Sequence, residues 1–316
     1  MATPVRPAVS VIISAVLLGG GCAEDHGDDP PQPSSSEFQT SDVPPDAVVE
    51  TEDTIAIDER SLYLKCWGEP VPGEPTVLLL SGQGPPVSYW EPMAPDLATE
   101  GHHLCGYDRA GVGRSEAPPE DRRTTDDQVA DLVAMLDAAD LNEPLVVVAH
   151  SLGSLPAIAL ADRAPQRVAG VVFVDPWAPR VSSTLLAALP PEKPHESAAL
   201  MEERRFLTDF LNDPAQNSER LLLAACDEQA AALLDQPGPI FGDRPVLVLQ
   251  APFPPRPVGL PRDYDEVARA AWTNGNKELA AESTRGEVIE VENTGHDIHA
   301  DRPEVVMDAI RDVIAG

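Results

Sequence analysis

Ser151 stands where an apolar stretch meets a stretch with helical character, and a serine at such a junction can act as a nucleophile. The residues from Leu145 to Ala149 read Leu-Val-Val-Val-Ala and predict a buried strand, whereas residues 155–163 predict a helix. Ala149 and Gly153 lie two positions before and after the serine, and small residues there let the strand and the helix close tightly. Such a turn strains the serine backbone and exposes its Oγ at the carboxyl end of the strand. The alternative is that Ser151 only caps a helix in some other α/β protein.

A histidine that could act as the base lies near the end of the chain. His296 falls in the stretch Asn-Thr-Gly-His-Asp-Ile-His, between a strand expected at 288–291 and a helix expected at 303–314. A loop at the carboxyl edge of the last strand can reach Ser151, so His296 would take the serine proton and return it to the leaving group. His299 is the competing candidate. Four other histidines are expected at the surface, at an edge or in packing: His102, His103, His150 and His195.

A carboxylate must orient the histidine, and Asp175 is the preferred candidate. It directly follows a strand expected at 168–174, beside the strand that leads to the nucleophile. Many enzymes with this arrangement carry the acid after the following strand, expected here at 245–250. In this chain the loop after that strand begins Ala-Pro-Phe-Pro-Pro-Arg and holds no acid until Asp263. The alternatives to Asp175 are Asp263, Asp265 and, more remotely, Asp297.

A glycine-rich turn could supply the groups that stabilise an oxyanion. Residues 76–80 predict a core strand, and Ser-Gly-Gln-Gly-Pro-Pro follows it at 81–86. Such a turn leaves backbone N–H groups unpaired, and two of these can stabilise the negative charge that develops on an attacked carbonyl oxygen. The sequence points to the amides of Gln83 and Leu152, the second being the residue after the candidate nucleophile. The alternative is a plain loop between a strand and a helix.

Strand and helix patterns alternate from residue 76 to residue 163, which predicts an α/β fold with a mostly parallel central sheet and helices on both faces. Residues 48–67 predict an opening pair of antiparallel strands. From 177 to 243 the alternation stops, and helical stretches with several prolines predict a helical lid over the carboxyl ends of the strands. Asp108 and Arg109 directly follow the strand expected at 102–107. They are expected to pair with each other and to brace loops near the site.

The charge of the chain argues against one class of partner. Lysine and arginine number 22 against 53 aspartate and glutamate residues, which gives a formal net charge of −31. Phosphate backbones would be repelled, so nucleic acid is not expected as a partner.

The first residues indicate export. Residues 1–22 carry a weakly basic start, an apolar stretch too short to span a bilayer, and Leu-Gly-Gly-Gly-Cys, and they predict a signal peptide. The small residues before Cys22 resemble a bacterial lipobox, so Cys22 is expected to be lipidated and to anchor the protein to the outer face of a bacterial membrane. The alternative is a plain secretory signal and a secreted or periplasmic protein. Residues 23–46 are acidic and rich in proline and serine, which predicts a disordered linker before a domain at 47–316.

The remaining cysteines suggest one disulfide and no metal site. Cys66 ends the strand expected at 61–67, and Cys105 lies in one expected at 102–107. If these strands are neighbours, a bond between the two cysteines is geometrically plausible, whereas the alternative is two separate buried thiols. Cys226 is then left over. No spacing typical of a metal site occurs, so no metal is expected.

Taken together, the motifs resemble those of the α/β-hydrolase superfamily over about residues 61–315. Ser-Gly-Gln-Gly, Tyr-Asp-Arg-Ala-Gly-Val-Gly-Arg-Ser, Ala-His-Ser-Leu-Gly, Val-Val-Phe-Val-Asp-Pro and Thr-Gly-His-Asp-Ile-His occur in the order typical of that superfamily. The chain is most similar to exported bacterial members with a YDRAG motif, which implies a Cys66–Cys105 pair and favours Asp175 as the acid. Two departures are Ala149 in place of glycine and Ser81 where many members have histidine.

The resemblance implies a serine hydrolase that acts on small-molecule carboxylic esters through an acyl-enzyme, with Ser151, His296 and Asp175 as its triad and without a cofactor. The alternatives are a peptidase or amidase of the same fold and a non-catalytic surface lipoprotein that binds a ligand under the lid. The oligomeric state is left open.

Overall fold

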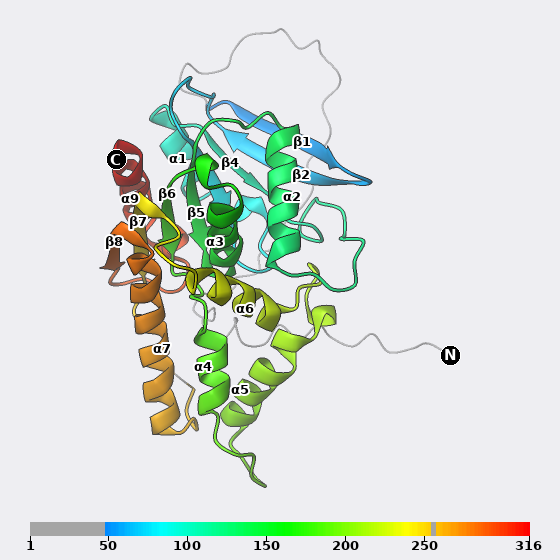
Figure 1. Ribbon diagram of the computed structural model, residues 1–316, viewed down its shortest axis with the longest axis vertical. Coiled ribbons are helices and arrows are strands. Elements are labelled where there is room, and N and C mark those ends of the chain that lie inside the picture. The colour runs from blue at the N-terminus through cyan, green and yellow to red at the C-terminus, as the bar shows by residue number, and fades with distance from the viewer. Residues whose placement is uncertain (1–47, 254–256) are drawn as a thin grey trace, which may run out of the picture. The chain divides into compact units, whose positions relative to one another are not determined.

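The core of the protein is an eight-stranded sheet with the strand order β1-β2-β4-β3-β5-β6-β7-β8 (Figure 1). The computed structural model describes residues 48–253 and 257–316. The strands β1 and β2 pair antiparallel, as do β2 and β4, and every other pair is parallel. The strands are β1 (Glu50–Ile57), β2 (Arg60–Trp67), β3 (Thr76–Leu80), β4 (Leu104–Tyr107), β5 (Leu145–His150), β6 (Val168–Val174), β7 (Gly242–Gln250) and β8 (Ser283–Glu290). The predicted fold class, a mostly parallel sheet with helices, is confirmed.

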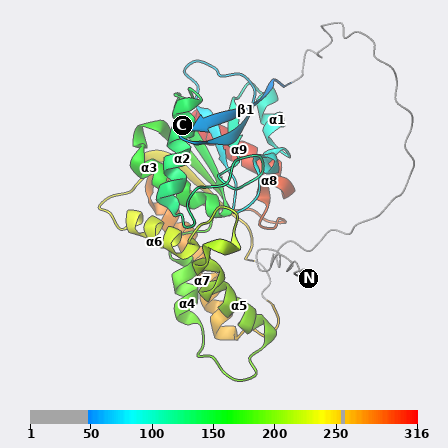
Figure 2. The same ribbon diagram turned by 90° about the vertical axis from the view of Figure 1, so that its right-hand side faces the viewer.

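The central strands are buried on both faces, because helices cover each side of the sheet. Neighbouring residues of β3 illustrate this: Leu78 packs into one hydrophobic cluster with α2 and α3, whereas Leu79 packs into a second cluster with α1 and α9. Figure 2 shows these two layers on opposite sides of the strands. The helices are α1 (Ala94–Thr99), α2 (Thr125–Ala138), α3 (Ser154–Arg163), α4 (Val181–Ala188), α5 (Ala198–Thr208), α6 (Leu223–Leu234), α7 (Arg262–Ala281), α8 (Ile298–Asp301) and α9 (Pro303–Ala315).

A helical insertion separates β6 from β7, as the sequence predicted for residues 177–243. It contains α4, α5 and α6, and it ends where β7 begins at Gly242. The long helix α7 follows β7 and packs against α4: a Cβ on Gly275 would lie only 2.8 Å from the Cβ of Ala178, just before α4. Both views show α4, α5 and α7 extending together beyond the sheet (Figures 1 and 2). The insertion and α7 therefore form one helical layer on the strands.

The expected signal peptide, the lipidated Cys22 and the linker at 23–46 lie outside the described residues. Within residues 48–253 and 257–316, no helix combines the length and the apolar character needed to cross a bilayer.

Asp227 is a buried carboxyl group on α6 of the insertion, only 3% exposed. Burial raises the pKa of Asp227 to about 7, although hydrogen bonds from the Arg180 backbone and the Ser182 hydroxyl oppose the rise. In the unfolded chain this carboxyl group ionises near pH 4. Between about pH 4 and pH 7 the unfolded chain therefore loses this proton while the folded protein keeps it, and the free energy of unfolding falls as the pH rises.

Replacement of Asp227 by asparagine is expected to stabilise the protein at pH 8 and not at pH 4. The wild-type deficit at pH 8 is on the order of 4 kcal/mol, since three pKa units correspond to that free energy. Urea unfolding at the two pH values measures the difference. Glu202→Gln, at an exposed position on α5, is the matched control and should leave both midpoints unchanged. An equal gain for Asp227→Asn at both pH values would contradict the role of the charge.

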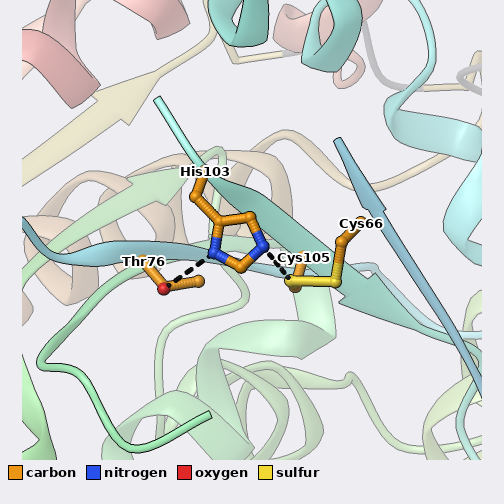
Figure 3. The surroundings of a disulfide bond; sticks show 4 residues. All are labelled: Cys66, Thr76, His103 and Cys105. Carbon is orange, nitrogen blue, oxygen red and sulfur yellow. Dashed lines mark hydrogen bonds between the residues drawn. A yellow bond between two sulfur atoms is a disulfide. The ribbon is translucent and has the colours of Figure 1, made fainter. Parts of the chain in front are cut away.

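A disulfide joins Cys66 of β2 to Cys105 of β4 (Figure 3). The two residues are direct partners in the antiparallel pairing, with their Cα atoms 4.1 Å apart. Nε2 of His103 lies 3.4 Å from the sulfur of Cys105, and its Nδ1 lies 3.1 Å from the hydroxyl of Thr76. Cys226 is a buried free thiol, and burial raises its pKa to about 12. The Cys66–Cys105 disulfide therefore links the antiparallel edge of the sheet to its parallel part.

Loss of this disulfide is expected to destabilise the protein by about 4 kcal/mol, because in the unfolded chain the bond closes a loop between cysteines 39 residues apart. The double variant Cys66→Ser with Cys105→Ser should show this loss in urea unfolding, and reduction of the wild type should reproduce it. Cys226→Ser is the control for removal of a thiol alone. If the double variant unfolds at the wild-type midpoint, the bond contributes nothing to stability.

Candidate active site

The turn predicted around Ser151 is present at the carboxyl end of β5. The strand ends at His150, a short 3₁₀ turn spans Ser151–Gly153, and α3 follows. Ser151 has a φ of +51°, a conformation that costs free energy for any residue with a side chain. A Cβ on Gly153 would lie 2.6 Å from the carbonyl oxygen of Leu80, so glycine is required where the turn approaches the end of β3. The sequence therefore folds here into a strained turn with a serine at its apex.

The loop after β3 lies directly against this turn. A Cβ on Gly82 would lie 3.1 Å from the Cβ of Ser151. Gln83 follows in the same loop, and among the described residues its amide N–H has no hydrogen-bond acceptor. The structure thus places the loop of Gln83 beside Ser151, and the amide of Leu152 belongs to the turn itself.

Asp175 and His296 meet through a hydrogen bond. Asp175 follows β6 with a φ of +43°, and its Oδ2 accepts a bond of 2.7 Å from Nδ1 of His296. Its Oδ1 accepts a bond of 2.9 Å from the backbone N–H of Ala251. Asp175 is 3% exposed, and burial raises the pKa of its carboxyl group, an effect that the bond from His296 opposes. Both carboxylate oxygens are therefore used, and the imidazole is held by its Nδ1.

His150 connects the turn of Ser151 to the loop of His296. Its Nε2 donates a hydrogen bond of 3.1 Å to the carbonyl oxygen of His296, and the two rings lie 4.6 Å apart between centroids. Burial lowers the pKa of His150 well below its usual value, which favours the neutral ring. From the sequence, His150 was expected only at the surface, at an edge or in packing, so this contact was not predicted. Because His150 directly precedes Ser151, the bond brings His296 to the serine turn.

The competing candidates occupy other places. His299 is fully buried, and its ring packs against Tyr89 and Trp90 with centroid distances of 4.4 and 4.7 Å. Burial lowers the pKa of His299 to about 4. Asp297 accepts a hydrogen bond from the hydroxyl of Tyr89. Asp263 and Asp265 lie in the first turn of α7. The structure therefore pairs His296 with Asp175 and with none of these acids.

The expected pair of Asp108 and Arg109 is wrong. The guanidinium of Arg109 binds Glu219, with Nε 2.6 Å from Oε2. The carboxylate of Asp108 accepts the backbone N–H groups of Val87 at 2.6 Å and Arg114 at 2.7 Å. The short aspartate side chain reaches one amide of its own turn and one amide of the segment after β3, whereas the longer arginine extends to the insertion. The expectation that both residues brace loops is met with different partners.

One group of described residues combines several potential metal ligands. The ligand atoms of Cys66, His103 and Cys105 lie within 4.8 Å of one another. The two sulfur atoms are bonded to each other, so they are not thiolates in this structure.

Comparison with known proteins agrees with this architecture. Residues 75–233 match the family model described as the alpha/beta hydrolase fold. The chain is 27% identical over 238 residues to the uncharacterized protein YqjL of Bacillus subtilis (strain 168), which covers 75% of this chain and 83% of that protein. It is 38% identical over 108 residues to the putative carbamate hydrolase RutD of Variovorax paradoxus (strain S110), but the match covers only 34% of this chain and 40% of that protein.

The solved structure of the enol-lactonase from Burkholderia xenovorans LB400 superposes with a TM-score of 0.57 at 19% identity, over 84% of this chain and all of that chain. A likeness at this identity shows the fold. The family model spans half of this chain, so the chain belongs to the alpha/beta hydrolase family and is a hydrolase.

Proposed function

We propose that the protein is a serine hydrolase that cleaves carboxylic esters of small molecules through an acyl-enzyme. The observation that carries the proposal is the 2.7 Å bond between His296 and Asp175, in a loop that His150 ties to the turn of Ser151. In chain order these residues run serine, acid, histidine, which is the order of this fold. Membership of the family establishes hydrolysis, whereas the triad and the ester substrate are what we propose here.

Each step of the reaction has a residue to perform it. Ser151 Oγ attacks the ester carbonyl, and Nε2 of His296 accepts the hydroxyl proton. The bond that Nδ1 donates to Asp175 keeps Nε2 free as the acceptor and stabilises the imidazolium that forms. The amides of Gln83 and Leu152 donate to the oxyanion. His296 then protonates the departing alkoxide, which leaves as the alcohol. A water molecule that gives a proton to His296 attacks the acyl-enzyme, and the carboxylic acid is released as His296 returns that proton to Ser151.

A cluster of aromatic side chains that starts at a residue bonded to the serine backbone favours an apolar acyl or ring group in the substrate. The backbone N–H of Trp177 donates to the carbonyl oxygen of Ser151 at 3.0 Å, so this tryptophan lies at the nucleophile. Its ring makes edge contacts with Phe206 of α5 and Trp272 of α7, with centroid distances of 6.3 and 6.4 Å. Phe206 in turn stacks on Phe210. These half-buried side chains form an apolar cluster that links Trp177 to the helical insertion and to α7.

A carbamate is the second candidate substrate. The similarity to a putative carbamate hydrolase over 108 residues favours it. The same triad would act on the carbamate carbonyl. Carbamates and amides are less reactive than esters, because their nitrogen donates electrons to the carbonyl. An ester therefore makes the smaller demand on the geometry described above.

Hydrolysis of matched nitrophenyl substrates by the purified full chain tests the proposal. Short and long p-nitrophenyl esters, a p-nitrophenyl carbamate and a p-nitroanilide share a chromophore and differ in the bond that is cleaved. We expect ester turnover with an initial burst of nitrophenol and labelling of Ser151 by a fluorophosphonate. Faster turnover of the carbamate or the anilide would transfer the function to those classes. A chain inert to every substrate and to the phosphonate would be better described as a ligand-binding protein.

A further inference from the structure

A buried ion pair lies beside the loop of Gln83, and the reaction described above does not use it. Arg109 follows β4, whereas Glu219 belongs to the helical insertion before α6. Nε and Nη2 of the arginine bind the two carboxylate oxygens at 2.6 and 2.9 Å. Arg109 is 6% exposed and Glu219 is 1% exposed. A bidentate pair so deeply buried fixes both side chains in one geometry.

The ion pair also forms hydrogen bonds with the backbone of the loop on both sides of Gln83. Nη1 of Arg109 donates to the carbonyl oxygen of Ser81 at 2.6 Å, and Nη2 donates to the carbonyl oxygen of Gly82. Glu219 accepts the N–H of Gly84 at 3.2 Å. Three backbone groups that flank Gln83 are therefore held by one ion pair.

Because the peptide unit is planar, the hydrogen bonds from Arg109 also fix the direction of the Gln83 N–H. The carbonyl of Gly82 and the N–H of Gln83 belong to the same trans peptide, so they point in opposite directions. When Arg109 holds that carbonyl oxygen, the N–H of Gln83 must point away from the guanidinium. On the proposed function, this N–H is one of the two donors to the oxyanion.

We propose that Arg109 and Glu219 are positioning residues that aim the N–H of Gln83 at the oxyanion, and that through Glu219 the helical insertion takes part in setting the catalytic step. The inference rests on the proposed function. Neither side chain touches the substrate, so both act through the loop. Loss of these hydrogen bonds to the loop leaves the proposed nucleophile, base and acid in place. It lets the N–H of Gln83 turn away from the developing charge.

Arg109→Lys separates the effect of the hydrogen bonds to the loop from the effect of the positive charge. Lysine keeps the positive charge beside Glu219, but a single ammonium group cannot hold two carbonyl oxygens and both carboxylate oxygens. Arg123→Lys is the matched control, because Arg123 is equally buried, pairs with Asp131 and makes no bond to the loop at 81–84. A second variant replaces both Arg109 and Glu219 by methionine, which leaves no unpaired charge in the interior and so protects the test from a failure to fold.

The diagnostic measurement is the rate ratio between an ester and its thionoester, in which sulfur replaces the carbonyl oxygen. Sulfur accepts hydrogen bonds weakly, so a well-aimed donor speeds the oxygen substrate selectively. For Arg109→Lys and the double methionine variant we expect kcat for the ester to fall roughly 10- to 100-fold with little change in KM, since one oxyanion donor is weakened. The oxygen-to-sulfur ratio should fall about tenfold with it, whereas Arg123→Lys should keep the wild-type ratio.

The outcomes separate this inference from the function on which it rests. A folded variant that loses activity equally on both substrates, or a control with the same loss of ratio, would reject the positioning role. An unchanged kcat would also reject it. A wild-type protein inert to both substrates would reject the proposed function, and this inference would fall with it.

Discussion

Ser151→Ala is expected to lower kcat for ester hydrolysis by at least roughly 10⁴-fold, because without the hydroxyl no acyl-enzyme can form. The residual rate should come from the oxyanion donors and from binding alone. The fluorophosphonate should no longer label the protein. Steady-state kinetics on a p-nitrophenyl ester, together with mass spectrometry of the labelled protein, measure both effects.

The matched control for this change is Ser154→Ala, three residues along the same turn and helix. The hydroxyl of Ser154 is buried and donates to the carbonyl oxygen of Trp177 at 2.8 Å, so its loss removes a structural bond. Ester turnover should stay within about tenfold of the wild type, because that hydroxyl takes no part in acyl transfer. Ester hydrolysis that persists in Ser151→Ala would mean that another group is the nucleophile.

The second large effect is expected for Asp175→Asn, with a fall in kcat of about 10³- to 10⁴-fold. The amide would present N–H groups to Nδ1 of His296, which then carries the lone pair, and the proton would move to Nε2. In that tautomer the imidazole cannot accept the proton of Ser151. KM should change little, because the side chain of Asp175 is buried and faces the histidine.

Asp263→Asn and Asp265→Asn are the controls, since both residues were alternatives for the acid. Each variant should hydrolyse esters at a rate close to that of the wild type. Circular dichroism and thermal unfolding of Asp175→Asn show whether the sheet is intact. A near-normal rate in Asp175→Asn, with a collapse in one of the other two, would move the acid to α7.

The sequence predicted what depends on neighbours along the chain. The strand, turn and helix around Ser151 carry their signal within a short segment, because buried parallel strands are continuous apolar runs. Asp175 could be chosen because an acid follows directly on a strand and because the loop after β7 offers none nearby. The last strand was placed at 288–291, whereas β8 spans Ser283–Glu290. Residues 284–287 are exposed and polar or glycine, whereas Val288 and Ile289 are half-buried, so the apolar pattern covers only the end of the strand.

The sequence could not predict contacts that only the fold creates. Arg109 and Glu219 are 110 residues apart, and no periodic pattern links a loop after a strand to a turn in a helical insertion. His150 looked like packing because a histidine at the end of a strand has no local signature. Its partner is a backbone carbonyl 146 residues away, and every residue offers such a group. Long-range polar contacts therefore need the assembled sheet before they can be recognised.

The positions of Ser151 and Asp175, directly after the adjacent strands β5 and β6, also bear on how the protein loses activity. Both residues belong to one strand–helix–strand unit, β5-α3-β6, whose closure costs little chain entropy. His296 comes from a loop 121 residues beyond Asp175 and is held by a few polar bonds at the sheet edge. Local opening of that loop would separate the proposed base from the proposed nucleophile while the sheet stays folded. Inactivation by heat or denaturant should therefore precede unfolding of the sheet, and it should reverse as the loop closes again.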